Sequence, residues 1–431
     1  MSSDTVLRLP KRMAAPREDA PRLRLEFLDG LRGLSALYVV LFHVWLIMNW
    51  QGFLRGHVDG DGLPGWLQAA SSWMRYGAAS VAVFIVLSGY CLMLPVVTTD
   101  GGKLRGGAWG FLKRRARRIL PPYYASLALS LLLIALVPGL RTVSHTWWDH
   151  VLPAFSRGAL ISHLFLFHNL TSHWNLKING VLWSVATEWQ IYFLLPFLLL
   201  PVWRRFGLLA LIGVSYVLGC LPHYVFHGQV DSASYWYIGL FGLGMAGVIL
   251  GFSEDAVVTH WRRRFPWLPL AFVLCVAYGA VASWTFSFKH GLIKDTLIGL
   301  AVTSLLIRCT NALKEGPKAS GLCVSLFLRL FECRAAKALG SFSYSLYLTH
   351  ALVLGCLYLA LRIHHASPMV SFFVLLLSGV PLSLGVAFLF HLAFERRFLS
   401  SPRPLQKSDR DNISLPASIG MAEVQGSMHV I

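Results

Sequence analysis

Long apolar segments alternate with short polar segments along most of the chain. Apolar runs of about 17–25 residues, the length that a helix needs to cross a bilayer, recur about ten times. They lie at 31–49, 73–96, 120–139, 182–201, 207–222, 235–252, 267–285, 291–308, 339–361 and 370–394. This pattern predicts an all-α fold, a polytopic integral membrane bundle of about ten transmembrane helices.

Polar segments frame this predicted bundle, which we place at 27–398. Residues 1–26 are basic and rich in proline, and residues 399–431 are polar, so both ends are predicted to be disordered. A further apolar stretch near 158–170 contains His163 and His168. It is too short to span a bilayer, so we interpret it as an interfacial helix.

Basic residues are concentrated in every second polar segment, and the segments between them contain few. Lys and Arg collect in the cytoplasmic loops of membrane proteins, so the alternation predicts that both termini are cytoplasmic. The aromatic residues that then fall at the outer face, as interfacial anchors do, are Trp147, Trp148, Trp174, Tyr235, Trp236 and Tyr237.

Composition supports the membrane assignment and excludes other classes. Only 13% of the residues are charged, against about 25% in soluble proteins. The net charge of +18 comes from basic clusters between apolar runs, so it indicates topology control and contact with lipid headgroups, and not binding to nucleic acid. The seven cysteines show no C-x-x-C spacing, which argues against a disulfide framework and a metal site.

Two ionisable residues in the first apolar run need an explanation, because charged groups inside lipid are costly. Arg32 and His43 are eleven residues apart, which at 100° per residue is only about 20° beyond three full turns. Both side chains therefore project from one helix face, roughly 16 Å apart along the axis. Alone, His43 could be a structural histidine and Arg32 could extend to the cytoplasmic edge, but their shared face favours a functional pair.

The run that begins near residue 182 carries a carboxylate, Glu188, about one turn inside, shortly after Trp183. The dipole at a helix N-terminus partly compensates a negative charge, and a carboxylate beside a histidine fixes the tautomer of the ring. We therefore consider Glu188 a partner for a catalytic histidine. A structural salt bridge, or exposure at the membrane interface, is the alternative.

Hydroxyl groups are concentrated in the ninth run, which also holds Tyr347 and His350. These two residues are three positions apart and share a helix face. Ser88 adds a hydroxyl in the second run. Such groups either line a polar cavity or join helices through hydrogen bonds, and both interpretations stay open.

A cluster of arginines precedes the third run and is followed by Pro121, Pro122 and Tyr123. Arginine binds phosphate through a bidentate fork, so the cluster could hold the phosphates of a nucleotide-containing donor. A positive signal that only sets topology is the alternative. The cluster consists of Arg114, Arg115, Arg117 and Arg118.

Taken in order, these segments resemble the acyltransferase-3 family of bacterial membrane O-acyltransferases. The resemblance covers about 27–398 and rests on six motifs, which include an opening Arg-x(10)-His, a Trp-Ser-x-x-x-Glu and a late Ser-Tyr-Ser-x-Tyr-Leu-x-His. Each motif alone is weak evidence for the family, but all six in the order of the family are specific evidence for it. They lie at Leu28–His43, Phe84–Tyr90, Arg114–Tyr123, Trp183–Tyr192, Gly340–His350 and Phe394–Arg396.

The resemblance implies transfer of an acyl group, usually acetyl, from acyl-CoA to a hydroxyl of a carbohydrate or glycolipid, without a permanently bound cofactor or metal. It implies a place in the bacterial cytoplasmic (inner) membrane. It assigns catalysis to His43, as general base or acyl carrier, together with Glu188 and Arg32. The expected substrate- and donor-binding residues are Arg114, Arg117, Arg118, Tyr123, Ser88, Trp183, Tyr347 and His350.

Two features depart from the family pattern. Trp189 follows Glu188 where members often carry Glu or Gln. The tail is also too short for the extracytoplasmic hydrolase-like domain that some members have. We therefore expect the membrane domain to act alone or with a partner.

Two other classes stay open. A transporter or flippase for a glycan intermediate would also line its path with polar residues, although no inverted repeat is visible. A membrane acyltransferase of the type that pairs His with Asn is suggested by His168, Asn169 and His173, but these residues lie in a loop-like stretch.

Overall fold

The computed structural model of the chain is helical. It describes residues 25–50, 62–98, 102–142, 148–151, 156–282, 288–316 and 321–398, and no strand occurs in these ranges. The predicted all-α membrane fold is therefore confirmed. The predicted disorder of the two ends falls outside the described residues, except that Glu26 already begins the first helix.

The α-helices differ widely in length, and short 3₁₀ and π segments join several of them. The α-helices are α1 (Glu26–Met48), α3 (Gly65–Ser71), α4 (Ser80–Thr98), α5 (Gly107–Leu136), α6 (Trp148–Val151), α7 (Arg157–Leu164), α8 (Ser172–Asn175), α9 (Leu182–Leu194), α10 (Leu200–Val225), α11 (Tyr237–Phe252), α12 (Ala256–Arg264), α13 (Trp267–Val281), α14 (Phe288–Glu315), α15 (Leu322–Glu332), α16 (Arg334–Ser341), α17 (Ser343–Ile363), α18 (Pro368–Val374) and α19 (Val380–Phe390). The 3₁₀ segments are η1 (Ser72–Ala79), η3 (Pro138–Arg141), η4 (His168–Leu170), η6 (Asp231–Ala233) and η9 (Arg396–Phe398). The π segments are η5 (Leu195–Leu199), η7 (Leu375–Gly379) and η8 (His391–Glu395).

Eight of the described helical segments are long and apolar enough to cross a membrane, or nine if α12 and α13, which are bent by 61°, form one span. Each predicted apolar run falls on one of these segments or on the bent pair. The eight are Glu26–Met48, Gly65–Thr98, Gly107–Leu136, Leu182–Val225, Asp231–Phe252, Lys289–Glu315, Ser343–Ile363 and Pro368–Phe398.

One segment accounts for the difference from the predicted ten spans. Leu182–Val225 holds two of the predicted runs, 182–201 and 207–222. Its backbone leaves the helical conformation at Gly207, where φ is 86° and ψ is −168°. Glycine adopts this conformation readily because it has no Cβ, so a break lies where the sequence predicted a boundary. The count of ten and the cytoplasmic termini stay predictions.

Two helix boundaries differ from those predicted. α5 begins at Gly107 and so includes the arginine cluster, with both prolines inside the helix. In the ninth run, α16 ends at Ser341 and a new helix begins at Ser343. α16 lies directly against α1 there, since a Cβ on Gly340 would be 2.1 Å from the carbonyl oxygen of Asp29.

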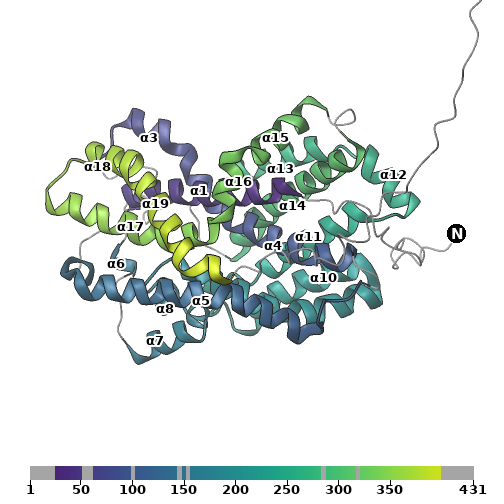
Figure 1. The fold of residues 1–431 in the computed structure, drawn as a ribbon, viewed down its shortest axis with the longest axis horizontal. Coiled ribbons are helices and arrows are strands. Elements are labelled where there is room, and N and C mark those ends of the chain that lie inside the picture. The colour runs from purple at the N-terminus through teal and green to yellow at the C-terminus, as the bar shows by residue number, and fades with distance from the viewer. Residues whose placement is uncertain are drawn as a thin grey trace, which may run out of the picture. The chain divides into compact units, whose positions relative to one another are not determined.

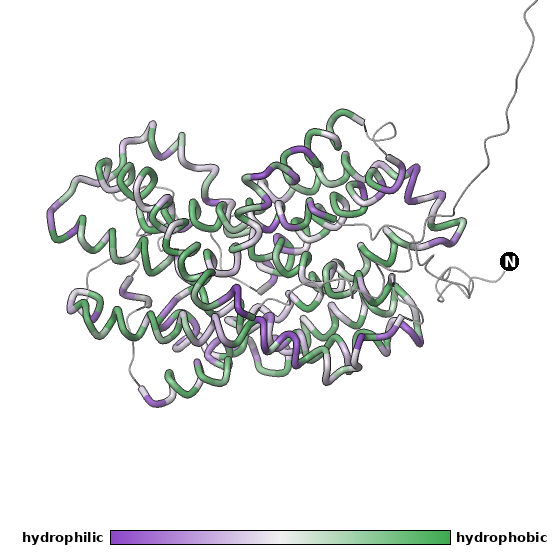
Figure 2. Tube along the Cα trace, in the orientation of Figure 1, coloured by the Kyte–Doolittle hydropathy of each residue, from purple (hydrophilic) through white to green (hydrophobic). Residues whose placement is uncertain are grey.

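Small residues allow the central helices α4 and α11 to pack closely along each other (Figure 1). A Cβ on Gly89 would be 2.2 Å from the carbonyl oxygen of Phe241, and one on Gly244 would be 2.1 Å from that of Val86. Close backbone approach at small residues is the usual way in which membrane helices associate. Figure 2 shows that hydrophobic residues line much of the long helices, with hydrophilic stretches in the first half of α5 and on α12.

Candidate active site

Two histidines from distant helices meet inside the bundle. α1 carries His43 and α17 carries His350, and the Nδ1 atom of His43 lies 3.2 Å from the Nε2 atom of His350. The rings meet edge to face, with centroids 4.7 Å apart and an interplanar angle of 74°. His350 is fully buried and His43 is half-buried. Both were candidates in the sequence, where nothing indicated that they touch.

Backbone carbonyl groups determine where the two rings carry their hydrogens. The Nδ1 atom of His43 lies 2.9 Å from the carbonyl oxygen of Val39, and that of His350 lies 2.9 Å from the carbonyl oxygen of Leu346. Carbonyl oxygens only accept hydrogen bonds, so each neutral ring carries its hydrogen on Nδ1. The Nε2 atom of His350 then accepts from His43, and Nε2 of His43 keeps its lone pair. That nitrogen is in the form that a general base requires.

Tyr347 connects the histidine pair to α9. Its ring centroid lies 6.0 Å from that of His350, and its hydroxyl oxygen lies 2.6 Å from the Oγ atom of Ser184. Phe84 of α4 packs edge-on against the same ring, at 5.9 Å between centroids. The structure thus brings the predicted Tyr347–His350 face together with His43.

Glu188 binds a tyrosine of its own helix segment. The hydroxyl of Tyr192 donates to Oε1 of Glu188 at 2.5 Å, and the Oγ atom of Ser88 lies 3.0 Å from the same hydroxyl. We expected Glu188 to pair with His43, but the structure pairs the carboxylate with Tyr192 and the histidine with His350. A supporting role of Glu188 in catalysis stays a prediction.

Two arginines place positive charge near Glu188. Arg32 of α1 and Arg115 of α5 both interact electrostatically with the carboxylate. Arg32 also forms a 3.4 Å ion pair with Asp29 and donates to the Sγ atom of Cys91 at 3.5 Å. We call Arg32, Arg115 and Glu188 the arginine–glutamate cluster.

The structure separates the members of the arginine-rich segment of α5. Arg114 and Arg117 are exposed, and Arg114 donates to the carbonyl oxygen of Arg105 at 2.6 Å. Arg115 is half-buried, and its Nε atom is enclosed without a hydrogen-bond partner among the described residues. Arg118 is half-buried as well, so the predicted donor-binding residues included one of the two half-buried arginines and omitted Arg115.

Helical spacing could have identified Arg115. It lies four positions after Phe111 and four before Ile119, and both of these residues are buried. At 3.6 residues per turn the three positions share one face, and this face packs into the bundle. The exposed Arg117 is two positions away and therefore points elsewhere.

Two of the predicted binding residues have other contacts. Tyr123 is fully buried and donates to the carbonyl oxygen of His163 at 2.8 Å, so it fastens α7 to α5. This contact does not direct its hydroxyl toward a donor. Trp183 is half-buried at the start of α9, and its ring centroid lies 6.1 Å from that of Tyr237 at the start of α11.

A buried carboxylate near the end of the bundle holds α17 in place. Ser345 donates to Oε2 of Glu395 at 2.6 Å, and the Nδ1 atom of His391 lies 2.9 Å from the same oxygen. Glu395 and His391 lie on the π segment η8, a distortion that is frequent at functional sites. Glu395 belongs to the closing motif, but its contact with Ser345 could not be read from the sequence.

The His168–Asn169 pair packs inside the fold. His168 is fully buried and stacks on His163, with ring centroids 4.0 Å apart and an interplanar angle of 9°. Burial lowers the pKa of His168 to about 2, so its ring is neutral. The amide of Asn169 donates to the Oγ1 atom of Thr187 at 3.0 Å. These contacts fit a structural role better than a catalytic His–Asn pair.

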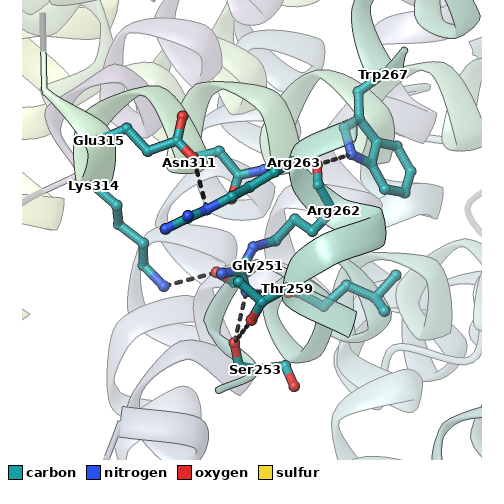
Figure 3. A network of polar contacts seen from close by, with 10 residues as sticks. Gly251, Ser253, Thr259, Arg262, Arg263, Trp267, Asn311, Lys314 and Glu315 are labelled. Carbon is teal, nitrogen blue, oxygen red and sulfur yellow. Dashed lines mark hydrogen bonds and ion pairs between the residues drawn. The ribbon is translucent and has the colours of Figure 1, made fainter. Parts of the chain in front are cut away.

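A second polar network closes the C-terminal end of α11 (Figure 3). Arg262 donates to the carbonyl oxygens of Leu250 and Ser253 at 2.9 and 2.7 Å, and Lys314 donates to that of Gly251 at 2.7 Å. The last carbonyls of a helix lack partners within it, and cations compensate its negative end. The network therefore holds α12 and α14 against α11.

Anions are the class of ligand that the charged part of the site could hold. Arg32 and Arg115 place two guanidinium groups within electrostatic reach of Glu188, and Arg32 also pairs with Asp29. Groups of three or more His, Cys, Asp and Glu residues that could bind a metal ion do not occur among the described residues.

Comparisons with known proteins agree with these observations. A family profile described as an acyltransferase domain matches residues 25–392. YrhL of Bacillus subtilis, named provisionally as a peptidoglycan O-acetyltransferase, is 26% identical over 354 residues, or 75% of this chain and 47% of that protein. The peptidoglycan O-acetyltransferase OatA of Listeria monocytogenes is 24% identical over 364 residues, or 75% of this chain and 48% of that protein.

A third relative is similar over a shorter stretch. Nodulation protein 10 of Rhizobium leguminosarum is 26% identical over 185 residues, or 41% of this chain and 44% of that protein. The chain spans about half the length of the curated relatives that it matches. No solved structure gives a significant match. Because the family profile covers nearly all of the helical bundle, including His43, Glu188 and His350, the chain belongs to the acyltransferase-3 family.

Proposed function

We propose that this protein is a bacterial membrane O-acyltransferase, which transfers an acyl group, acetyl in the first instance, from acyl-CoA to a hydroxyl of a carbohydrate. The contact between His43 and His350 carries this proposal, because it leaves a basic nitrogen inside the bundle. The names of two relatives support a carbohydrate acceptor. The expected location is the cytoplasmic membrane, where a membrane enzyme can reach cytoplasmic acyl-CoA.

The histidine pair can provide each proton transfer that this reaction needs. Nε2 of His43 takes the proton of the acceptor hydroxyl while the hydroxyl oxygen attacks the thioester carbonyl. A C–O bond forms, the C–S bond breaks, and the proton passes from the imidazolium to the departing CoA sulfur. His350 accepts the Nδ1 hydrogen of His43, and this hydrogen bond becomes stronger when His43 is charged.

The arginine–glutamate cluster is suited to the donor. CoA carries phosphate groups, which guanidinium groups bind with a bidentate fork. Arg115 is half-buried, and its positive charge lies within electrostatic reach of Glu188. Its guanidinium group is therefore placed to attract a phosphate that approaches this part of the bundle.

Replacing the base tests the proposal. Glutamine keeps the approximate size and the hydrogen bonds of histidine but does not titrate, so His43→Gln should lose about 10²–10⁴-fold in turnover. The purified variant in lipid nanodiscs should match the wild type in thermal stability. Turnover is measured as thioester consumption at saturating acetyl-CoA with soluble peptidoglycan glycan strands as acceptor.

The matched control is His364→Gln, which changes an exposed histidine just after α17 and should keep wild-type turnover. A His43→Gln variant that retains more than about a tenth of the turnover contradicts the mechanism. A wild type that consumes no acyl-CoA but moves a glycan across the membrane would favour the transporter instead.

A further inference from the structure

A buried carboxylate away from the histidine pair lies among aromatic rings. Asp295, about two turns into α14, is 6% exposed, and its Oδ2 atom accepts a 2.9 Å hydrogen bond from Nε1 of Trp236. It lies within electrostatic reach of Tyr237, Tyr278 and Lys294. An ionisable residue inside a membrane helix is costly and indicates a functional site.

Three polar atoms of Asp295, Tyr237 and Tyr278 have no hydrogen-bond partner in the part of the chain that the structure describes. Among the described residues, nothing donates to Oδ1 of Asp295, and the hydroxyls of Tyr237 and Tyr278 form no hydrogen bond. The two tyrosines are only 5% and 7% exposed. Buried polar groups are normally paired, so this arrangement suits the polar groups of a ligand.

The residues around Asp295 lie at the N-terminal end of α11, and the polar network of Figure 3 lies at its C-terminal end. Trp236 precedes the first turn of α11 and Tyr237 begins it, whereas Gly251 and its Lys314 contact lie at the last turn. Trp183, at the start of α9, adds a further aromatic ring, with its centroid 6.1 Å from that of Tyr237.

The same group connects to the histidine pair. Tyr237 interacts electrostatically with Tyr347, and the ring of Tyr347 packs beside that of His350. From Asp295, the side chains of Tyr237, Tyr347 and His350 thus lead to the base His43.

The cationic groups lie toward the other end of α11. Arg32 contacts Cys91 of α4. The neighbouring Tyr90 approaches the C-terminal half of α11, where its ring lies 3.4 Å from a Cβ placed on Gly247 and its hydroxyl 3.9 Å from one on Gly251. The groups suited to the donor and those around Asp295 thus approach the histidine pair from opposite directions.

We propose that Asp295, Tyr237 and Tyr278, with the ring of Trp183, form the subsite that binds one saccharide unit of the acceptor. This inference rests on the proposed O-acyl transfer and adds where and how the acceptor is held. A carboxylate accepts strong hydrogen bonds from sugar hydroxyls, and tyrosine hydroxyls both donate and accept. Aromatic rings with a few convergent polar groups are typical of small-molecule sites.

Asp295→Asn tests this subsite. The amide oxygen of the variant can keep the hydrogen bond from Trp236, but it turns the unpaired Oδ1 acceptor into a donor and removes the charge. We expect the KM for soluble peptidoglycan glycan strands to rise about tenfold or more. The KM for acetyl-CoA and the kcat at saturating acceptor should stay within about twofold, since neither the donor site nor the base is changed.

Two further variants test whether a change in the acceptor KM is specific to this subsite. Tyr278→Phe removes one unpaired hydroxyl and should raise the acceptor KM severalfold, which keeps the test valid if Asp295→Asn does not fold. The matched control is Asp231→Asn, because Asp231 is already paired with His223 at 2.9 Å. Its acceptor KM should equal that of the wild type. Binding of the glycan strands without donor, followed by calorimetry, should weaken in parallel with KM.

The outcomes separate this inference from the proposed function. A wild type that transfers acetyl groups, with an unchanged acceptor KM in Asp295→Asn and Tyr278→Phe, overturns the subsite alone and makes Asp295 a structural partner of Trp236. A wild type that consumes no acetyl-CoA overturns the proposed function and the subsite with it.

Discussion

His43 and His350 lie 307 positions apart in the chain, yet they share a hydrogen bond inside the bundle. The carbonyl groups of their own helices direct both Nδ1 hydrogens. As a result, Nε2 of His43 is the ring nitrogen whose lone pair can take up a proton. A histidine in lipid without such partners could carry its hydrogen on either nitrogen.

Arg115 is the residue whose role changes most between sequence and structure. Because it faces the interior next to Glu188, Arg115→Gln should raise the KM for acetyl-CoA about tenfold or more, by removing a charge-assisted hydrogen bond to phosphate. Lys113→Gln is the matched control. It removes the same charge at an exposed position of the same segment, outside the predicted donor-binding residues, so its KM should stay within about twofold of the wild type.

Donor saturation curves at fixed acceptor measure both variants. Equal increases in the two would mean that the cluster acts only through its total charge. No change in either would return the whole segment to the topological role that the sequence also allowed.

At the scale of the elements, the contact between α4 and α11 determines the geometry of the site. α4 contributes Ser88 to Tyr192, and α11 contributes Tyr237 next to Trp183. Glycines let the two backbones approach closely. The positions of these functional side chains therefore depend on glycines, which have no functional side chain.

Gly244→Ala should therefore destabilise the bundle. Its Cβ would lie 2.1 Å from the carbonyl oxygen of Val86, and this clash forces the helices apart at a cost of about 1–3 kcal/mol. Gly213→Ala is the control, because nothing lies within 4 Å of a Cβ at that position of α10 and alanine favours a helix over glycine. Thermal unfolding in detergent should show a lower Tm for Gly244→Ala only. A Gly244→Ala variant as stable as Gly213→Ala would contradict the close contact.

At the scale of the whole molecule, the two ends of α11 differ in chemistry. Arg262 and Lys314 bind its C-terminal carbonyls, whereas Asp295 and aromatic rings surround its N-terminus. Basic residues favour the cytoplasmic side of a membrane. The cationic end should therefore face the cytoplasm, where acyl-CoA is found, and the Asp295 end should face outward.

Topology reporters check this orientation. Fusions after residues 110 and 420 should read cytoplasmic, and a fusion after residue 148 should read outside, because basic segments alternate with segments poor in Lys and Arg. A cytoplasmic reading at residue 148 would exclude the arrangement of ten spans with both termini inside.

Local patterns in the sequence were sufficient to predict where the membrane helices lie. Whether a stretch of about 20 residues can enter lipid depends on the hydropathy of that stretch alone. Each predicted run therefore falls on helical structure, although the run at 339–361 is divided between α16 and α17. The shared face of Arg32 and His43 followed from helical periodicity in the same way. Even the break at Gly207 lies where polar residues had marked a boundary.

Only the tertiary structure decided which side chains meet. The contacts of His43 with His350, of Tyr347 with Ser184 and of Trp236 with Asp295 join helices that are far apart in the chain. No local pattern specifies such pairs, because the direction of a side chain around its helix does not say which neighbouring helix it faces. The packing of the helices against one another makes that choice, and with it the base and the acceptor subsite proposed for this acyltransferase.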